Sequence, residues 1–547
     1  MNKFIQKLKD PKERKFFYAI FGGKLLGLGL CFALIFAVSA FVGSANKAHA
    51  QAAPAAATAP AAAPAAAPAA APATPPIAAV PADSPYVNPI NTMWVLVTAF
   101  LVFFMQAGFM FLEAGFARTR ETVNVLLEGI VDTCLCGILF YAWGFAWMFG
   151  AGDGLHGLIG NQYYCLQNIP DTYGSTGVAT LAFFLFQFAF ADTCSTITSG
   201  AMLGRTGFWG DLWYSIGVSG FIYPIFGHWA WGPDGWLNNI HPAAFHDFAG
   251  STVVHTIGGT IALAGAIVLG PRLGRKFKRD GGGPMPYHSM TVASVGAIIL
   301  WFGWYGFNPG STLSAMDFMG IARVATNTTL AACTGGLGAL FFVYPRNKKW
   351  DCGATLNGLL AGLVAITCPC YWVSPFGAMC LGAVAGVVVI LATDLLEYLR
   401  IDDPCGAWPV HGAAGIWGTW SLGLFATGQF GAPTPQGADN SAGSVVSGLF
   451  YGGGWSQFIG QVEGNAAIGI SVFVVSMVLM YAVKATGTLR ISKEGELEGL
   501  DLHEHGGVAY PELTDGIGNV LVNGAGAAYA SAADGKGSSV PGGAVAT

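Results

Sequence analysis

The sequence predicts an all-α, polytopic membrane protein with about eleven transmembrane helices. Of its 547 residues, 53% are hydrophobic and only 10% are charged, and the mean hydropathy is +0.53. A soluble protein of this size would be less apolar. Apolar stretches of spanning length alternate with short polar breaks between Asn91 and Arg490. The 78 glycines also favour this class, because small residues let membrane helices approach closely.

The first 90 residues are predicted to form a targeting segment and a linker rather than part of the folded domain. Basic residues precede an apolar core from about Leu25 to Val42, and an Ala-His-Ala sequence follows it. This order predicts a secretory signal peptide over 1–50. The apolar core is nearly long enough to span a bilayer, so an uncleaved anchor is the alternative. The Ala/Pro-rich residues after it predict a periplasmic linker over 51–90, because dense proline blocks a packed helix.

The transmembrane domain is predicted over 91–490, followed by a tail over 491–547. Its helices are expected near 92–114, 127–149, 178–203, 209–230, 248–270, 288–308, 320–345, 354–369, 375–399, 410–428 and 464–488. Lysine and arginine occupy alternate breaks: Arg118, Arg120, Arg205, Arg272, Arg275, Lys276, Lys278, Arg279, Arg346, Lys348, Lys349 and Arg400.

The intervening breaks, near 150–177, 231–247, 309–319, 370–374 and 429–463, hold no lysine or arginine. By the positive-inside rule, the basic breaks are cytoplasmic. With an odd number of helices, the mature N-terminus lies outside and the tail lies in the cytoplasm. Arg323 is the exception, near the outer end of the seventh helix, where Asp317 is its expected partner.

Two matched stretches each place one aspartate before an apolar helix and one histidine within it. Seven residues separate Asp247 from His255, and seven separate Asp403 from His411. Each histidine follows a valine, and a glycine occurs four positions later. An ionisable residue inside a membrane segment is costly, so it indicates function. A hydrogen-bonded structural histidine is the alternative at each position, and the matched pair disfavours it.

The two histidines belong to the fifth and tenth predicted helices, which enter the membrane from opposite faces. A matched helix five positions later with the opposite direction predicts two inverted five-helix repeats plus one extra helix. Sites in such folds form near the midplane, where the halves meet. We therefore expect His255 and His411 to face each other near the centre of the membrane.

Aromatic residues gather at the outer ends of three predicted helices, in 186–192, 228–232 and 304–311. Aromatic faces attract cations that have lost part of their water, such as ammonium. An interfacial aromatic belt is the alternative, because most membrane proteins have one.

Several longer stretches resemble the ammonium transporter family, the Amt/Mep/Rh group. They are Asp247–His255, Gly303–Ser311, Asp402–Gly412 and the tail segment Glu498–Gly506. The resemblance extends from about Asn91 to Pro511.

The resemblance implies a role for each of eight residues. They are Phe186, Trp231 and Ser311 as ammonium-binding residues, Phe190 and Phe307 as the pore gate, His255 and His411 as the pore histidines, and Asp247 as a site-shaping residue. Having both Trp231 and Ser311 favours the ammonium transporter branch over the Rh-type branch. No catalytic residue is expected.

The expected function is ammonium transport across the cell inner membrane, without enzymatic activity, cofactor, metal or nucleic acid. Cys368-Pro-Cys370 lacks the spacing of a zinc site. The resemblance further implies a homotrimer and a PII-type signal protein as a cytoplasmic partner. An ammonium sensor with impaired flux is one alternative. A haem- or quinone-linked oxidoreductase using the two histidines as ligands is another, but the sequence has no C-x-x-C-H site.

Overall fold

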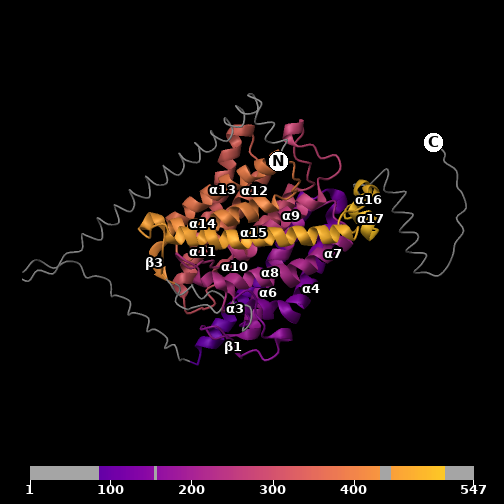
Figure 1. The fold of residues 1–547 in the computed structure, drawn as a ribbon. Helices are drawn as coiled ribbons and strands as arrows, with labels where there is room; N and C mark the ends of the chain where they lie inside the picture. Colours follow the sequence, from indigo (N-terminus) through magenta and orange to yellow (C-terminus); the bar gives the residue numbers. More distant parts are fainter. Residues whose placement is uncertain (1–84, 153–156, 432–444, 512–547) are drawn as a thin grey trace, which may run out of the picture.

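The computed structural model describes residues 85–152, 157–431 and 445–511. The predicted signal peptide, most of the linker and the end of the tail lie outside these residues. Within them the chain makes eleven helical passages (Figure 1). The uninterrupted passages are α3 (Val87–Phe116), α6 (Thr180–Gly200), α10 (Met290–Gly310), α11 (Phe318–Asn347), α12 (Cys352–Thr367), α13 (Pro375–Leu399) and α15 (Ser456–Ala485).

The other four passages contain π-helical turns. They are α4 (Thr122–Leu139), η2 (Phe140–Gly144) and α5 (Phe145–Phe149); α7 (Phe208–Gly217), η4 (Val218–Ile222) and α8 (Tyr223–Trp231); η6 (Ser251–Thr256) and α9 (Ile257–Leu269); and η8 (Trp408–Ala413) and α14 (Ala414–Phe425).

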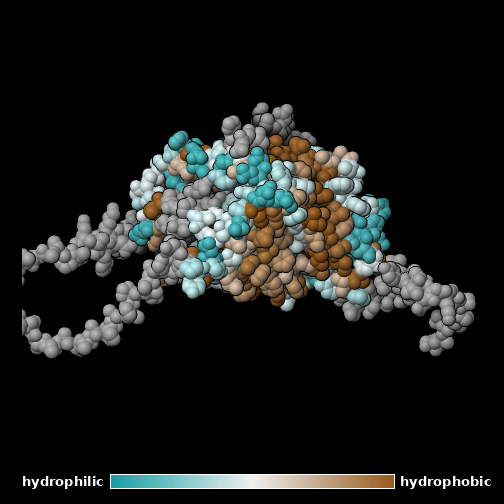
Figure 2. Space-filling view, turned by 90° about the horizontal axis from the view of Figure 1, so that it is seen from below, coloured by the Kyte–Doolittle hydropathy of each residue, from teal (hydrophilic) through white to brown (hydrophobic). Residues whose placement is uncertain are grey.

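The predicted fold class is confirmed. Eight of the described helical segments are long and apolar enough to cross a membrane, and α12 is a shorter apolar helix. Large apolar side chains such as Phe100, Ile138, Ile298, Phe341 and Val478 are exposed on the outside of the bundle. In Figure 2 hydrophobic residues form broad patches in the middle of the molecule, with hydrophilic residues mostly toward its two ends. The chain is therefore a multi-pass membrane protein whose apolar sides face lipid.

Short polar side chains begin several of these helices. Ser289, Asp317, Asp351 and Ser374 each accept a hydrogen bond from a backbone N–H in the first turn of α10, α11, α12 and α13, respectively. The first four N–H groups of a helix lack intrahelical partners, and serine and aspartate satisfy them well. These capping residues therefore stabilise the starts of the four helices.

The last helical passage, α15, and the tail after it pack on one side of the helix bundle. Helix α15 packs along α9 and α14 (Figure 1). After it come the short helices α16 (Lys493–Glu498) and α17 (Leu500–His505), which pack against each other, and α17 lies against the start of α4. Asp501 Oδ1 accepts a 2.9 Å hydrogen bond from the Asn124 N–H, and His505 Nε2 lies 2.9 Å from Asn124 Oδ1. The tail thus supplies the cap that α4 lacks in its own flanking sequence.

Small two-stranded sheets cover the opposite end. Strands β1 (Thr172–Tyr173) and β2 (Val178–Ala179) pair antiparallel, and so do β3 (Thr427–Gly431) and β4 (Val445–Ser447). Backbone groups in these connections are thereby paired rather than left in the apolar region.

Arg323 and Asp317 are linked through Tyr371 instead of contacting each other directly. Arg323 Nε donates a 3.0 Å hydrogen bond to the Tyr371 carbonyl, and its guanidinium lies 4.6 Å from the Tyr371 ring centroid. The Tyr371 hydroxyl donates to Asp317 Oδ2 at 2.8 Å. A basic residue near the start of α11 is thus held by an aromatic ring and a carbonyl.

Candidate functional site: a pore lined by two histidines

The half-helix that carries His255 begins at a fully buried aspartate. Asp247 Oδ1 accepts the N–H groups of Gly250 and Ser251, and Oδ2 accepts those of Thr252 and Val253, at distances of 2.8–3.0 Å. One carboxylate therefore satisfies four backbone donors at a helix start inside the protein, where water would otherwise be needed.

The second half-helix repeats this construction. Asp403 Oδ1 accepts the N–H groups of Gly406 and Ala407, and Oδ2 accepts that of Trp408, each at 2.9 Å. In both half-helices the histidine then falls in a π-helical turn, within η6 and η8. π-Turns are rare and are often found at functional sites. The matched spacing in the sequence therefore reflects a matched backbone.

The glycines four positions after each histidine lie where the two half-helices cross. A Cβ added to Gly259 would overlap the backbone of Gly412. One added to Gly415 would lie 2.6 Å from the Ser251 carbonyl oxygen. Each glycine thus lets the opposite half-helix approach closely. This close crossing brings the two histidines together from opposite directions.

The imidazoles of His255 and His411 face each other, as expected from the sequence. Their Nδ1 atoms are 3.2 Å apart and their ring centroids 5.2 Å apart. A hydrogen bond at this distance requires one Nδ1 to donate and the other to accept. Trp304 and Phe307 stack on His255, with ring centroids at 5.2 and 5.4 Å. His255 Nε2 is buried and has no hydrogen-bond partner, so it is available to a small polar solute.

On one side of the histidines, called the outer side below after the topology expected from the sequence, two phenyl rings stack on each other. Phe190 and Phe307 stack with their centroids 4.0 Å apart and their planes inclined by 20°. Both side chains are fully buried. Because Phe307 also contacts His255, these rings separate the outer recess from the histidine pair.

A recess of about 220 Å³ lies above the phenyl pair. Its lining residues are Phe186, Gln187, Phe190, Trp231, Phe248, Ser311 and Leu313. The Trp231 Nε1–H donates to the Asp247 carbonyl at 2.8 Å, which fixes the indole. The Ser311 hydroxyl donates to the Phe307 carbonyl at 2.8 Å, which fixes this side chain at the edge of the recess. Aromatic faces and a hydroxyl oxygen together suit a small cation with N–H donors.

A second cavity, of about 310 Å³, lies on the inner side of the histidines. It is lined by Phe109, Leu112, Glu113, Ile197, Gly200, Asn357, Leu360, Cys405, Gly406, Ala407, Val410 and His411. The order from the outer end is therefore recess, phenyl pair, histidine pair and inner cavity. All eight residues singled out from the amino-acid sequence line or adjoin the recess, the phenyl pair, the histidine pair or the inner cavity.

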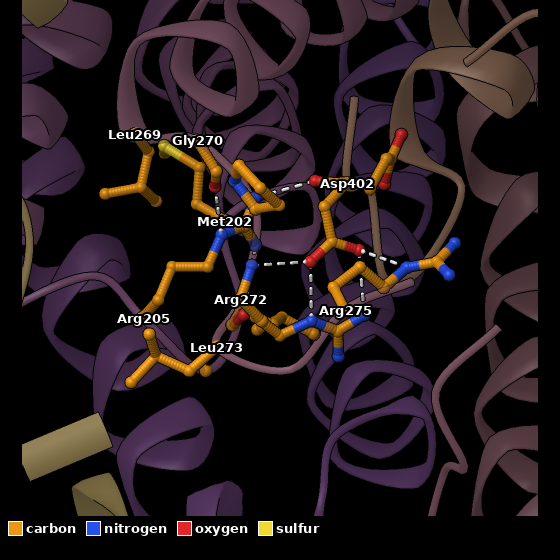
Figure 3. A network of polar contacts seen from close by, with 12 residues as sticks. Met202, Arg205, Leu269, Gly270, Arg272, Leu273, Arg275 and Asp402 are labelled. Atoms are coloured by element: carbon orange, nitrogen blue, oxygen red, sulfur yellow. Dashed lines mark hydrogen bonds and ion pairs between the residues drawn. The ribbon is translucent and has the colours of Figure 1, made fainter. Parts of the chain in front are cut away.

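Buried ion pairs hold the segment just before the second half-helix (Figure 3). Arg272 donates to Asp402 from Nε at 2.8 Å and from Nη2 at 3.0 Å, and its backbone N–H donates at 3.0 Å. Arg275 Nε lies 3.3 Å from Asp402 Oδ1. Arg205, also buried, donates to the Asp402 carbonyl. Burial alone would raise the pKa of the Asp402 carboxyl, but the bonds from Arg272 and the charge of Arg205 hold it well below its usual value.

Arg272 and Arg275, two basic residues of the 272–279 loop, are therefore committed to contacts within the protein. Arg275 also pairs with Glu397. Lys276, Lys278 and Arg279 are the exposed basic residues of this loop. The exposed positive charge of this loop therefore comes from these three residues.

The sequence profile of the Ammonium Transporter Family matches residues 93–510. The chain belongs to the ammonium transporter family. Ammonium transporter Amt2 of Archaeoglobus fulgidus is 41% identical over 433 residues, which cover 78% of this chain and 89% of the relative. Ammonium transporter 1 member 3 of Solanum lycopersicum is 36% identical over 445 residues, covering 78% and 94%.

Solved structures of this family have the same fold. A structure titled Sensor Amt Protein is 35% identical, with a TM-score of 0.68, and the match covers 77% of this chain and 99% of that one. Candida albicans Mep2 is 28% identical, with a TM-score of 0.67 and coverage of 77% and 90%. The helical architecture of this ammonium transporter family member is thus shared with both.

Sequence reasoning missed several residues at the site. Gln187, Phe248 and Leu313 line the outer recess, and Glu113 lines the inner cavity. Gln187 and Phe248 are each next to a residue or stretch already singled out, so proximity in sequence was an available signal. Glu113 is an ionisable residue inside α3. Because charge inside a membrane is costly, its position in an apolar helix was itself a signal of function.

Proposed function

We propose that this protein conducts ammonia derived from ammonium into the cytoplasm, and that it is not an enzyme. Ammonium binds at Phe186, Trp231 and Ser311 and loses a proton. The uncharged ammonia then passes the gate formed by Phe190 and Phe307. The facing imidazoles of His255 and His411, behind a phenyl gate and between two cavities, are the observation that carries this proposal. Asp247 shapes the site by fixing Trp231 and the first half-helix.

The pore environment favours a neutral solute over a bare cation. Potassium and ammonium have similar sizes, but only ammonium can release a proton and continue as a neutral molecule. Moving an unpaired ion from water into an apolar conduit carries a large desolvation cost. Ammonia can accept and donate hydrogen bonds, so the unpaired Nε2 of His255 can interact with it. Selectivity then follows from excluding charge.

Substituting the histidines tests this function. The variants His255→Asp and His411→Asp place a carboxylate in the pore, which provides a partner for a permanent cation. In proteoliposomes on a solid-supported membrane, we expect potassium either to permeate or to block the ammonium response. His255→Ala and His411→Ala should reduce ammonium-evoked current without admitting potassium. Correctly folded variants that all keep wild-type current and selectivity would assign the histidines a purely structural role.

We also propose an orientation and an assembly. The protein lies in the cell inner membrane as a homotrimer with one pore per subunit, its mature N-terminus outside and its tail in the cytoplasm. A PII-type signal protein docks at the cytoplasmic face, on Lys276, Lys278 and Arg279 of the 272–279 loop, whose side chains are exposed. Pull-down with a PII protein across nucleotide conditions should detect this complex. Absence of binding under every condition would reject the partner.

An ammonium sensor is the second candidate, favoured by the similarity to the structure titled Sensor Amt Protein. A pure sensor would bind ammonium at the outer recess without passing it. Methylammonium uptake in cells that lack other ammonium transporters distinguishes the two functions. Uptake supports transport, whereas binding without uptake supports the sensor.

A further inference from the structure

Two buried amides on the last helical passage contact the half-helix that carries His255. Gln461 and Asn465 are four residues apart on α15 and therefore lie on the same face of the helix. Both side chains are buried, and α15 packs along α9 and α14, the helices that continue the two histidine turns. Polar groups inside a membrane domain are costly and therefore indicate function. Hydrogen bonding that only joins neighbouring helices is the alternative.

Asn465 bridges two positions of η6, the π-helical turn that contains His255. Its Nδ2 donates a 2.8 Å hydrogen bond to Thr252 Oγ1 and lies 3.4 Å from Thr256 Oγ1. Thr256 follows His255 directly in the chain, and its hydroxyl donates to the Ser251 carbonyl at 3.0 Å. Because this bond uses the hydroxyl proton of Thr256, a group facing its oxygen must be a donor. The amide of Asn465 supplies that donor.

The π-helical turn needs such support because its hydrogen bonds are wider than those of an α-helix. The His255 N–H bonds to the Gly250 carbonyl, and the Ile257 N–H bonds to the Thr252 carbonyl, each five residues back. π-Turns are rare compared with α-helical turns, so neighbouring contacts are needed to stabilise them. A return to α-helical bonding would shift the register by one residue and rotate the side chain of His255. The hydrogen bonds to Thr252 and Thr256 oppose this change.

The second half-helix encloses the same turn from the other side. A Cβ added to Gly415 would lie 2.7 Å from Thr256 Oγ1, and one added to Gly469 of α15 would lie 3.8 Å from Thr256 Cγ2. Thr252 Oγ1 lies 2.6 Å from Thr419 Oγ1 of α14. The two threonines of the turn thus connect the amide on α15 with the second half-helix.

Gln461 fixes the start of the first half-helix. Its Oε1 accepts the His246 N–H at 2.8 Å, and its Nε2 donates to the His246 carbonyl at 2.7 Å and to the Thr419 carbonyl at 3.2 Å. His246 immediately precedes Asp247, whose carboxylate caps the half-helix. Helix α15 therefore holds the first half-helix at its start through Gln461 and at its π-helical turn through Asn465.

We propose that Asn465 is a positioning residue that keeps the imidazole of His255 directed at His411, by stabilising the π-helical turn through Thr252 and Thr256. The inference deepens the proposed transport function and rests on it for the current measurements below. Close approach of glycines sets the separation of the half-helices, and Asn465 fixes the turn within one of them. Its loss should therefore slow passage through the pore and leave ammonium recruitment at the outer recess unchanged.

The test uses the full-length protein in proteoliposomes, with current on a solid-supported membrane normalised to folded protein. Asn465→Leu keeps the approximate size of the side chain but cannot donate a hydrogen bond. Thr256→Val removes the same link from the other side, which decides the question if Asn465→Leu fails to fold, and Thr256→Ser retains the hydroxyl. Ser476→Ala is the matched control, because Ser476 is also a buried hydroxyl on α15 and its Oγ has no hydrogen-bond partner within the described part of the chain.

We expect Asn465→Leu and Thr256→Val to lower the maximal ammonium current by at least about fivefold, because misplacing a functional group by about 1 Å can cost roughly 10²-fold. The ammonium concentration for half-maximal current should not change. Thr256→Ser and Ser476→Ala should behave as wild type. Unchanged maximal current in Asn465→Leu, an equal loss in Thr256→Ser or Ser476→Ala, or a change in the half-maximal concentration alone overturns the positioning role.

Nitrogen NMR of protein with isotope-labelled histidines gives an arm that does not depend on transport. The Nδ1 atoms of His255 and His411 are 3.2 Å apart, so wild type should show a coupling across their hydrogen bond. Asn465→Leu and Thr256→Val should lose this coupling, and Ser476→Ala should keep it. Current lost while the coupling persists, or a wild type without the coupling, overturns the proposal. A wild type that shows the coupling but carries no ammonium current refutes the transport function, and the coupling in the variants then decides the positioning role.

Discussion

Replacing Asp402 with asparagine should destabilise the protein strongly. Asp402 receives three hydrogen bonds from Arg272, and both side chains are almost fully buried. The substitution keeps the size of the side chain but leaves the arginine without its counter-charge. Removing one partner of a buried ion pair typically costs about 3–5 kcal/mol. Because the lost bonds hold the loop before the His411 half-helix, we expect the same variant to reduce ammonium flux.

Unfolding of detergent-solubilised protein in increasing denaturant provides the assay. The exposed pair of Asp280 with Arg400 supplies the control, because exposed ion pairs contribute little. Asp280→Asn should therefore shift the unfolding midpoint much less than Asp402→Asn. Equal shifts for the two variants would refute the claim that burial makes the Asp402 network important.

The same ion pair predicts a pH dependence. The folded-state pKa of Asp402 is lowered, so its stabilising contribution is fully present above the ordinary aspartate pKa, about 3.9. It is lost as pH falls through the lowered value. The stability difference between wild type and Asp402→Asn should therefore stay constant from pH 8 to about 5 and shrink only below about 4. A difference that shrinks between pH 7 and 6 would contradict this assignment.

Two further substitutions test the outer recess and the tail. Trp231→Leu should raise the ammonium concentration for half-maximal current by about 2- to 30-fold, because a cation–aromatic contact contributes about 0.5–2 kcal/mol; an unchanged value would remove Trp231 from the site. Asp501→Ala should accelerate hydrogen exchange of the Asn124 amide, because the loss of a helix cap costs about 0.5–2 kcal/mol, and unchanged exchange would show that the tail does not cap α4.

The facing of His255 and His411 could be predicted from the sequence because the two half-helices have the same spacing between aspartate and histidine. Seven residues between Asp247 and His255, repeated before His411, reflect one backbone unit used twice. The resemblance to the family added the roles, and family membership and fold are confirmed. The roles of the individual site residues remain predictions.

A group of four buried acidic residues was not singled out from the sequence, although the same rule about charge in membranes applies to them. Glu128, Asp132, Asp192 and Asp211 lie on three different helices. Their proximity depends on how α4, α6 and α7 pack, which no local pattern reveals. Likewise, the contact between Asp501 and Asn124 joins positions 377 residues apart. Burial of Arg272 and Arg275 also required the fold, since both occur in a loop that reads as a solvent-exposed basic run.

The close approach of Gly259 to the backbone of Gly412 means that the separation of the two half-helices is set by main-chain contact rather than by the histidine rings. Side chains at 255 and 411 can therefore be exchanged while the half-helices keep their separation. The backbone positions of residues 255 and 411 relative to each other are therefore fixed by the contact between the half-helices. Changing the distance between the half-helices would instead require substitution of Gly259 or Gly415, where an added Cβ meets the opposite backbone.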